Sequence, residues 1–199
     1  MPRNLTYAAI ALMGGLLIWL LFFFPPQAPQ PLPQLSEPPS GGDFRLESQQ
    51  GPVTLAQLRG RVVALYFGYI TCPDICPTSL GYLAAALNAL DPQELAQVQG
   101  VFVSVDPQRD TLEQLRSYVQ YFHPSLLGAT GAPEQLAEMA KRYGAAYRIV
   151  PGEGALNYTV DHSADLYLID RQGKLRQTLR HGAPPEELVK ALRALLAET

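Results

Sequence analysis

The sequence is short of the residues that most often carry chemistry, since its 199 residues include two cysteines and three histidines. Basic residues are also few: 15 Lys and Arg stand against 18 Asp and Glu, and the net charge is -3. A nucleic-acid-binding protein needs a basic patch that neutralises phosphates. No basic run is present, so the composition excludes nucleic acid as the partner. There is no internal repeat either.

The two cysteines, Cys72 and Cys76, are separated by three residues and lie between an apolar run, 62–67, and a helical pattern. A disulfide that closes so short a loop stabilises a fold by roughly 2 kcal/mol, against about 4.7 kcal/mol for a 100-residue loop. A structural staple is therefore a poor explanation of the pair. Chemistry explains it better.

Two kinds of chemistry use such a pair. Redox exchange needs an exposed, acidified thiolate and a second thiol, and a strand-to-helix turn supplies both exposure and the positive end of a helix. Metal binding needs two thiolates that converge on one ion, and soft sulfur ligands select Cu(I) or zinc. Cys-x-x-Cys is the usual redox spacing, and the extra residue here lets both sulfurs face a shared point. The spacing suggests metal and leaves redox chemistry open.

The three histidines are the candidates for a third ligand. His162 immediately precedes a strand-like run, 166–170, and loops at strand entrances often carry function. His123 is interpreted as the end of a helix and His181 as a turn before the last helix. Both are interpreted as solvated polar residues. His162 is the candidate ligand.

Several motifs accompany the cysteines. The segment Tyr66 to Tyr69 runs into Thr71 to Pro77, which contains both cysteines. Further motifs are Val103 to Thr111, Asp161 to Ser163 and Tyr167 to Asp170. Together these motifs resemble the Sco/SenC family of membrane-anchored copper-binding proteins. Proteins of this family help to assemble CuA, the dinuclear copper site of cytochrome c oxidase. The resemblance covers nearly all of the chain after the first forty residues.

The resemblance implies that Cys72, Cys76 and His162 bind copper, as Cu(I), Cu(II) or both. The implied partners are the CuA-bearing subunit of cytochrome c oxidase and a thiol reductant or copper donor protein. An oxidising compartment would also require a reductant before the thiols take a metal.

Acidic residues around these motifs are candidates for supporting roles. Asp106 with Arg109 and Asp110 is interpreted as an ion-pair cluster that shapes its loop, with partner docking as the alternative. Asp161 and Asp165 flank His162, and either is a candidate to orient its ring. Asp74, between the cysteines, is a candidate to cap the helix or to tune the charge of the site.

The N-terminal part predicts a membrane anchor in residues 1–24. Leu5 to Phe24 is a run of twenty uncharged residues, which at 1.5 Å per residue reaches about 30 Å, the thickness of a bilayer core. Arg3 precedes the run and no charge follows it until Glu37, so the following domain is expected on the periplasmic side. Seven of the residues in 25–42 are proline, which predicts a semi-rigid linker.

Residues 43–199 alternate strand-like and helical patterns, which predicts an α/β sandwich of thioredoxin type with a central mixed sheet. A first hairpin is expected to turn at Gly51-Pro52. Pro77 suits the first position of the helix after the cysteines, which would place Cys76 near its N-cap. The other expected elements are a central strand at 61–67, a second buried strand at 101–105, a helix with its apolar side over 112–122, another with its apolar side over 136–143, a hairpin over 166–179 and a closing helix.

Two functions of different classes follow. The leading one is a metallochaperone, which is not an enzyme, with copper held by two thiolates and an imidazole. The alternative is a thiol-disulfide oxidoreductase that reduces the cysteines of its partner. Against it, the strand entered through Ser163 to Asp165 lacks the proline that a resemblance to thioredoxin would place there. A peroxidase shares the fold, but no feature singles out a lone peroxidatic cysteine.

Overall fold

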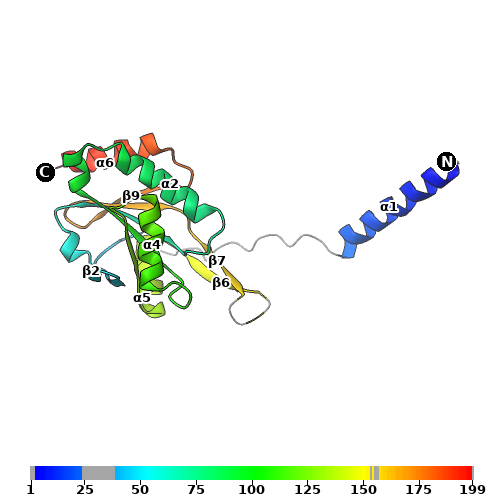
Figure 1. The fold of residues 1–199 in the computed structure, drawn as a ribbon, viewed down its shortest axis with the longest axis horizontal. Coiled ribbons are helices and arrows are strands. Elements are labelled where there is room, and N and C mark those ends of the chain that lie inside the picture. Colours follow the sequence, from blue (N-terminus) through cyan, green and yellow to red (C-terminus); the bar gives the residue numbers. More distant parts are fainter. Residues whose placement is uncertain (1–2, 24–38, 153, 155–156, 199) are drawn as a thin grey trace. The chain divides into compact units, whose positions relative to one another are not determined.

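The computed structural model describes residues 3–23, 39–152, 154 and 157–198. The chain divides into two units, Met1–Pro31 and Leu32–Thr199. The described part of the first is one helix, α1 (Arg3–Phe23) (Figure 1). No helix within the described residues has both the length and the hydropathy needed to cross a membrane. The structure therefore does not confirm the predicted membrane-spanning helix, and residues 25–38 of the predicted 25–42 linker lie outside the described residues.

The second unit is built on a seven-stranded mixed sheet with the order β2-β1-β5-β4-β3-β8-β9 (Figure 1). Strand β3 pairs in parallel with β4 and antiparallel with β8, so the predicted mixed sheet is confirmed. The strands of this sheet are β1 (Arg45–Ser48), β2 (Gly51–Thr54), β3 (Val62–Gly68), β4 (Val98–Ser104), β5 (Leu127–Thr130), β8 (Leu166–Ile169) and β9 (Leu175–Leu179).

Helices accompany this sheet, and a separate two-stranded ribbon pairs β6 with β7. The helices are α2 (Ile75–Asn88), α3 (Pro92–Ala96), α4 (Leu112–Phe122), α5 (Pro133–Tyr143) and α6 (Pro185–Ala197), with a short 3-10 turn, η1 (Ala56–Leu58). The ribbon strands are β6 (Tyr147–Pro151) and β7 (Tyr158–His162).

The core continues on both faces of β3, whose seven residues are all buried. Successive side chains of a strand point to opposite faces. Tyr66 packs against Phe102 of β4 on one face, with ring centroids 6.2 Å apart. Phe67 packs against Tyr143 of α5 on the other, at 6.3 Å. A strand covered on both faces reads as a continuous apolar run, which is why the sequence identified it.

Two local predictions are wrong. The first hairpin turns at Gln49-Gln50, because Ser48 Oγ accepts from the amide of Gln50 and donates to the carbonyl of Gly51. Helix α2 begins at Ile75 and not at Pro77, so Cys76 is its second residue. Proline is tolerated throughout the first helical turn, where amides have no partner within the helix.

Candidate metal centre

The cysteines lie where β3 ends and α2 begins. Cys76 is completely buried in the first turn of α2, and Cys72 is 9% exposed in the loop before it. The sulfur of Cys76 occupies space that Gly68, the last residue of β3, leaves open. A Cβ atom built on Gly68 would lie only 2.6 Å from this sulfur. The glycine therefore allows the helix to bring Cys76 against the end of the strand.

His162 approaches the cysteines from the ribbon, as the last residue of β7. Its Nε2 atom lies 3.3 Å from Sγ of Cys76 and 3.8 Å from Sγ of Cys72. The two sulfurs and the imidazole nitrogen all lie within 4.8 Å of one another, close enough to share one metal ion. The structure thus brings together the three residues that the sequence singled out.

The ring of His162 is oriented by its neighbours. Its Nδ1 atom lies 2.9 Å from the carbonyl oxygen of Ser163, so an Nδ1-H donor there leaves Nε2 free to bind a metal. The rings of Tyr66 and Tyr69 meet the imidazole edge-on, with centroids 6.2 and 5.7 Å away. The sequence proposed Asp161 or Asp165 for the orienting contact. Asp161 instead accepts from Arg148 at 2.7 Å, across the ribbon, and Asp165 accepts from the amide of His181 at 3.3 Å.

The two thiols are electrostatically unequal. The pKa of Cys72 lies well below its ordinary value, chiefly because its sulfur accepts a hydrogen bond from the thiol of Cys76 and further ones from the backbone amides of Cys76 and Asp74. The pKa of Cys76 is raised by that same hydrogen bond to Cys72 and by burial. The apo site therefore holds one thiolate and one thiol, and a metal ion that binds both sulfurs releases a proton.

The other acidic candidates have separate roles. Asp74 is the N-cap residue of α2, but its side chain makes no capping hydrogen bond. Asp106 forms the predicted ion pair with Arg109 and is nearly fully buried. Asp110 instead accepts from Ser104 Oγ at 2.6 Å and from the amide of Ile70 at 3.0 Å. Burial raises the pKa of Asp110.

The two remaining histidines lie away from the ligand group. His123 ends α4 as predicted, but it is 5% exposed and its Nδ1 accepts from the amide of Ser125, so its interpretation as a solvated residue is wrong. His181 is exposed, as expected, and its Nδ1 lies 3.0 Å from Ser79 Oγ.

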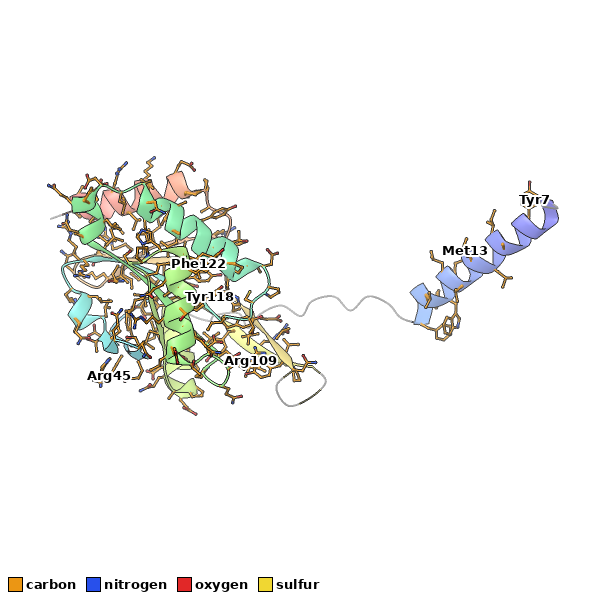
Figure 2. All side chains as sticks on the ribbon, in the orientation of Figure 1. Tyr7, Met13, Arg45, Arg109, Tyr118 and Phe122 are labelled. Carbon is orange, nitrogen blue, oxygen red and sulfur yellow. The ribbon has the colours of Figure 1, made fainter. Side chains whose placement is uncertain are left out.

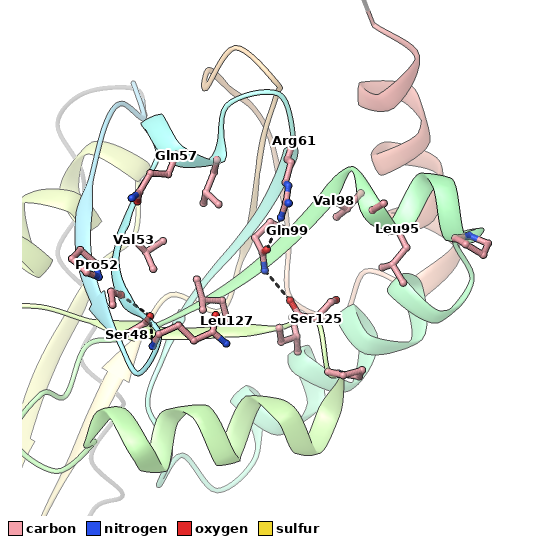
Figure 3. A pocket seen from close by; sticks show the side chains of 17 residues that line it. Ser48, Pro52, Val53, Gln57, Arg61, Leu95, Val98, Gln99, Ser125 and Leu127 are labelled. Carbon is pink, nitrogen blue, oxygen red and sulfur yellow. Dashed lines mark hydrogen bonds between the residues drawn. The ribbon is translucent and has the colours of Figure 1, made fainter.

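A cavity of about 770 Å³ lies at the other end of the parallel strands (Figure 3). Arg61 before β3, Gln99 in β4 and Leu127 in β5 line it, whereas the cysteines follow the far end of β3. Gln99 donates to the carbonyl of Ser125 at 2.8 Å and accepts from Arg61 at 3.3 Å. None of the three candidate ligands lines this cavity.

Comparison with known proteins places this arrangement in a family. A family model described as SCO1/SenC matches residues 33–197. The chain belongs to the SCO1/SenC family. Protein SCO2 homolog, mitochondrial, of Mus musculus is 39% identical over 158 residues, which make up 78% of this chain and 62% of the mouse protein. The chain thus matches less than two thirds of that relative.

Solved structures of SCO1/SenC proteins have the same fold. Arabidopsis thaliana ScoI with copper bound is 37% identical and has a TM-score of 0.71, covering 78% of this chain and 97% of that chain. Apo Sco1 of Thermus thermophilus is 39% identical with a TM-score of 0.72, covering 82% and 95%. The predicted thioredoxin-like α/β fold and the predicted family are confirmed.

The sequence does not point to the aromatic side chains of the site. Tyr66 and Tyr69 stand out only as part of a motif, and Tyr158, which contacts Asp106, does not stand out at all. The position of the Tyr66 ring follows from the alternation of side chains along β3, which places it on the α2 side of the sheet. Tyr158 had no comparable signal, because the ribbon that carries it was not predicted.

Proposed function

We propose that this SCO1/SenC protein is a metallochaperone that carries one copper ion on Cys72, Cys76 and His162 and delivers it to the CuA site of cytochrome c oxidase. The observation that carries the proposal is the convergence of two sulfurs and one imidazole nitrogen within 4.8 Å. Family membership and the copper-bound structure of the Arabidopsis relative support it.

The chemistry of the donor set fits copper. Thiolates are soft ligands that hold Cu(I) well, and an imidazole binds copper in either oxidation state. A structural zinc site would use four protein ligands, and the described residues offer a group of three. Three ligands leave a position where a ligand of the acceptor protein attacks, so the ion can pass between proteins without becoming free.

The test is a pair of histidine variants measured on the reduced protein under anaerobic conditions. His162→Ala removes the nitrogen ligand and is expected to weaken Cu(I) binding sharply in competition with a chromophoric chelator. His181→Ala, an exposed histidine outside the ligand group, is expected to leave the affinity unchanged. Transfer of copper to an apo CuA domain should fail for the first variant and succeed for the second. An unchanged affinity of His162→Ala would refute the proposal.

A second function is favoured by the two free cysteines at the start of α2, where hydrogen bonds that lower the pKa of Cys72 favour the thiolate that disulfide exchange needs. As a thiol-disulfide oxidoreductase, the protein would reduce the cysteines of the oxidase subunit before the metal arrives. His162→Ala separates the two functions, because exchange with a small disulfide depends on the two thiols and not on the imidazole that completes the ligand group. If His162→Ala lost both disulfide exchange and copper binding, His162 would be needed for both activities, and this variant would not distinguish the two functions.

Membrane attachment and a periplasmic location are also part of the proposal, and the uncharged run Leu5 to Phe24 supports them. A copper donor and a thiol reductant are proposed as further partners, because a buried thiol pair must be reduced before it takes a metal. Fractionation of cells that produce the full chain tests the attachment. Recovery of the protein in the soluble fraction would contradict it.

A further inference from the structure

The loop that joins β4 to α4, residues 105–111, contacts both segments that supply the candidate ligands. On one side Asp110 accepts from the amide of Ile70 at 3.0 Å. Ile70 lies two residues before Cys72. The same oxygen of Asp110 accepts from Ser104 Oγ, at the end of β4, at 2.6 Å. Asp110 thus ties the cysteine segment to the sheet.

On the other side the loop contacts Tyr158, the first residue of β7. The hydroxyl of Tyr158 donates to Asp106 at 2.6 Å, and Arg109 donates to the carbonyl of Tyr158 at 2.8 Å. The Arg109 guanidinium also lies 3.7 Å from the centroid of the Tyr158 ring. Figure 2 shows Arg109 beside the ribbon. Two loop residues therefore hold one ribbon residue by its hydroxyl, its carbonyl and its ring.

The ribbon needs such contacts. Its two strands pair only with each other and not with the seven-stranded sheet. Of its ten residues only Val160 is buried. An isolated pair of strands is marginally stable in water. At the His162 end, Ser163 and Ala146 exchange hydrogen bonds of 2.8 and 2.9 Å.

Tyr158 lies four residues before His162, which is about 13 Å along a strand. The contacts to Asp106 and Arg109 therefore hold the end of the ribbon opposite to the ligand. Arg109 also reaches the site more directly, because its guanidinium lies 5.7 Å from the ring centroid of Tyr69. That ring meets the imidazole of His162 edge-on.

We propose that Asp106, Arg109 and Tyr158 form a clamp that positions His162 for the metal, while Asp110 holds the cysteine segment in the same frame. None of the three clamp residues is itself a ligand. The clamp fixes the orientation of the ribbon, so that the imidazole meets the two sulfurs at bonding distance. This inference rests on the copper site proposed above.

The first test is Arg109→Lys, which keeps the positive charge. The guanidinium of Arg109 contacts the Asp106 carboxylate, the Tyr158 carbonyl and the Tyr158 ring at once, and the ammonium group of a lysine cannot make all three contacts. We expect Cu(I) affinity to fall about tenfold or more, the usual effect of losing a group that orients a ligand. In the His162→Ala background the same substitution should change the affinity by no more than about twofold, because the ligand it positions is absent.

Arg193→Lys is the matched control. Arg193 also pairs with a carboxylate, Glu94, and donates to a backbone carbonyl, that of Ala89, but it lies on α6 away from the site. The copper affinity of Arg193→Lys should equal that of the parent protein. Tyr158→Phe is a second variant, which keeps the ring and deletes only the hydroxyl. It should lose affinity about threefold or more, also only when His162 is present.

A readout without metal follows the ribbon itself. Amide hydrogen exchange in β6 and β7 of the apo protein should be faster in Arg109→Lys than in the parent, and unchanged in Arg193→Lys. Unchanged affinity in both clamp variants, or an equal loss with and without His162, would overturn the clamp alone. If His162→Ala binds copper as tightly as the parent, the proposed function and the clamp fall together. Should Arg109→Lys not fold, Tyr158→Phe decides.

Discussion

Replacing Gly68 by alanine tests whether the metal centre depends on space that only glycine leaves at the end of β3. The new Cβ would lie 2.6 Å from Sγ of Cys76, whereas ordinary van der Waals contact begins at 3.4 Å. It would also lie 2.9 Å from a ring carbon of Phe102 and 3.2 Å from one of Tyr66. The sulfur, held on the first turn of α2, must therefore move by about 0.8 Å.

Overpacking of a well-filled core costs about 1–3 kcal/mol, and we expect the free energy of unfolding to fall by that amount. The displaced sulfur no longer keeps its 3.3 Å distance from His162 Nε2. If half of that strain is relieved only when Cys76 leaves the ligand position, binding loses about 0.5–1.5 kcal/mol, and Cu(I) affinity falls about two- to twelvefold, since 1.4 kcal/mol is a factor of ten.

The assay combines urea denaturation of the reduced apo protein with chelator competition for Cu(I). Gly81→Ala is the control, because Gly81 lies within α2 and a Cβ there meets nothing within 4 Å. That variant should gain about 0.5–1 kcal/mol of stability and bind copper normally. A Gly68→Ala protein as stable as the parent and with the same affinity would refute the packing argument.

Three further predictions concern the thiols and the loops. Because the pKa of Cys72 is low, the rate of its alkylation by iodoacetamide should stay nearly constant from about pH 8 down to pH 5. The rate for an ordinary thiol falls about tenfold per pH unit in that range, and such a fall for Cys72 would contradict the prediction. Asp110→Ala leaves the Ile70 amide and the Ser104 hydroxyl without their acceptor, so urea titration should show a loss of about 1–3 kcal/mol, and an unchanged midpoint would speak against this role. Gly144 ends α5 with φ of 79°, so thermal unfolding of Gly144→Ala should reveal a loss of about 1 kcal/mol, absent if the helix end can rearrange.

The sequence predicted the parts of the fold that carry a strong local pattern. The apolar run of β3 and the helical spacing after the cysteines identified the βα unit that presents Cys72 and Cys76. The hairpin of β8 and β9 was marked by its turn, in which Gly173 has φ of 79°. These signals are local, because each depends on residues that are neighbours in the chain.

The ribbon was not predictable in the same way. Its strands are five residues long and mostly half-buried, so they show neither a buried run nor a clean alternation. His162 was expected in a loop and lies at the end of β7, and the segment before it carries Tyr158. The sequence could not indicate that the Ser163 carbonyl orients the imidazole ring, because every residue has a backbone carbonyl. The contact between Arg109 and Tyr158 spans 49 residues and depends on tertiary structure alone.

The most direct test of the central claim is X-ray absorption at the copper edge of the reduced, copper-loaded protein, with the metal content measured on the same sample. We expect one copper per chain, bound by the sulfurs of Cys72 and Cys76 and by one imidazole nitrogen, and loss of that nitrogen in His162→Ala. A ligand shell of sulfur alone, or a shell that His162→Ala leaves unchanged, would contradict it.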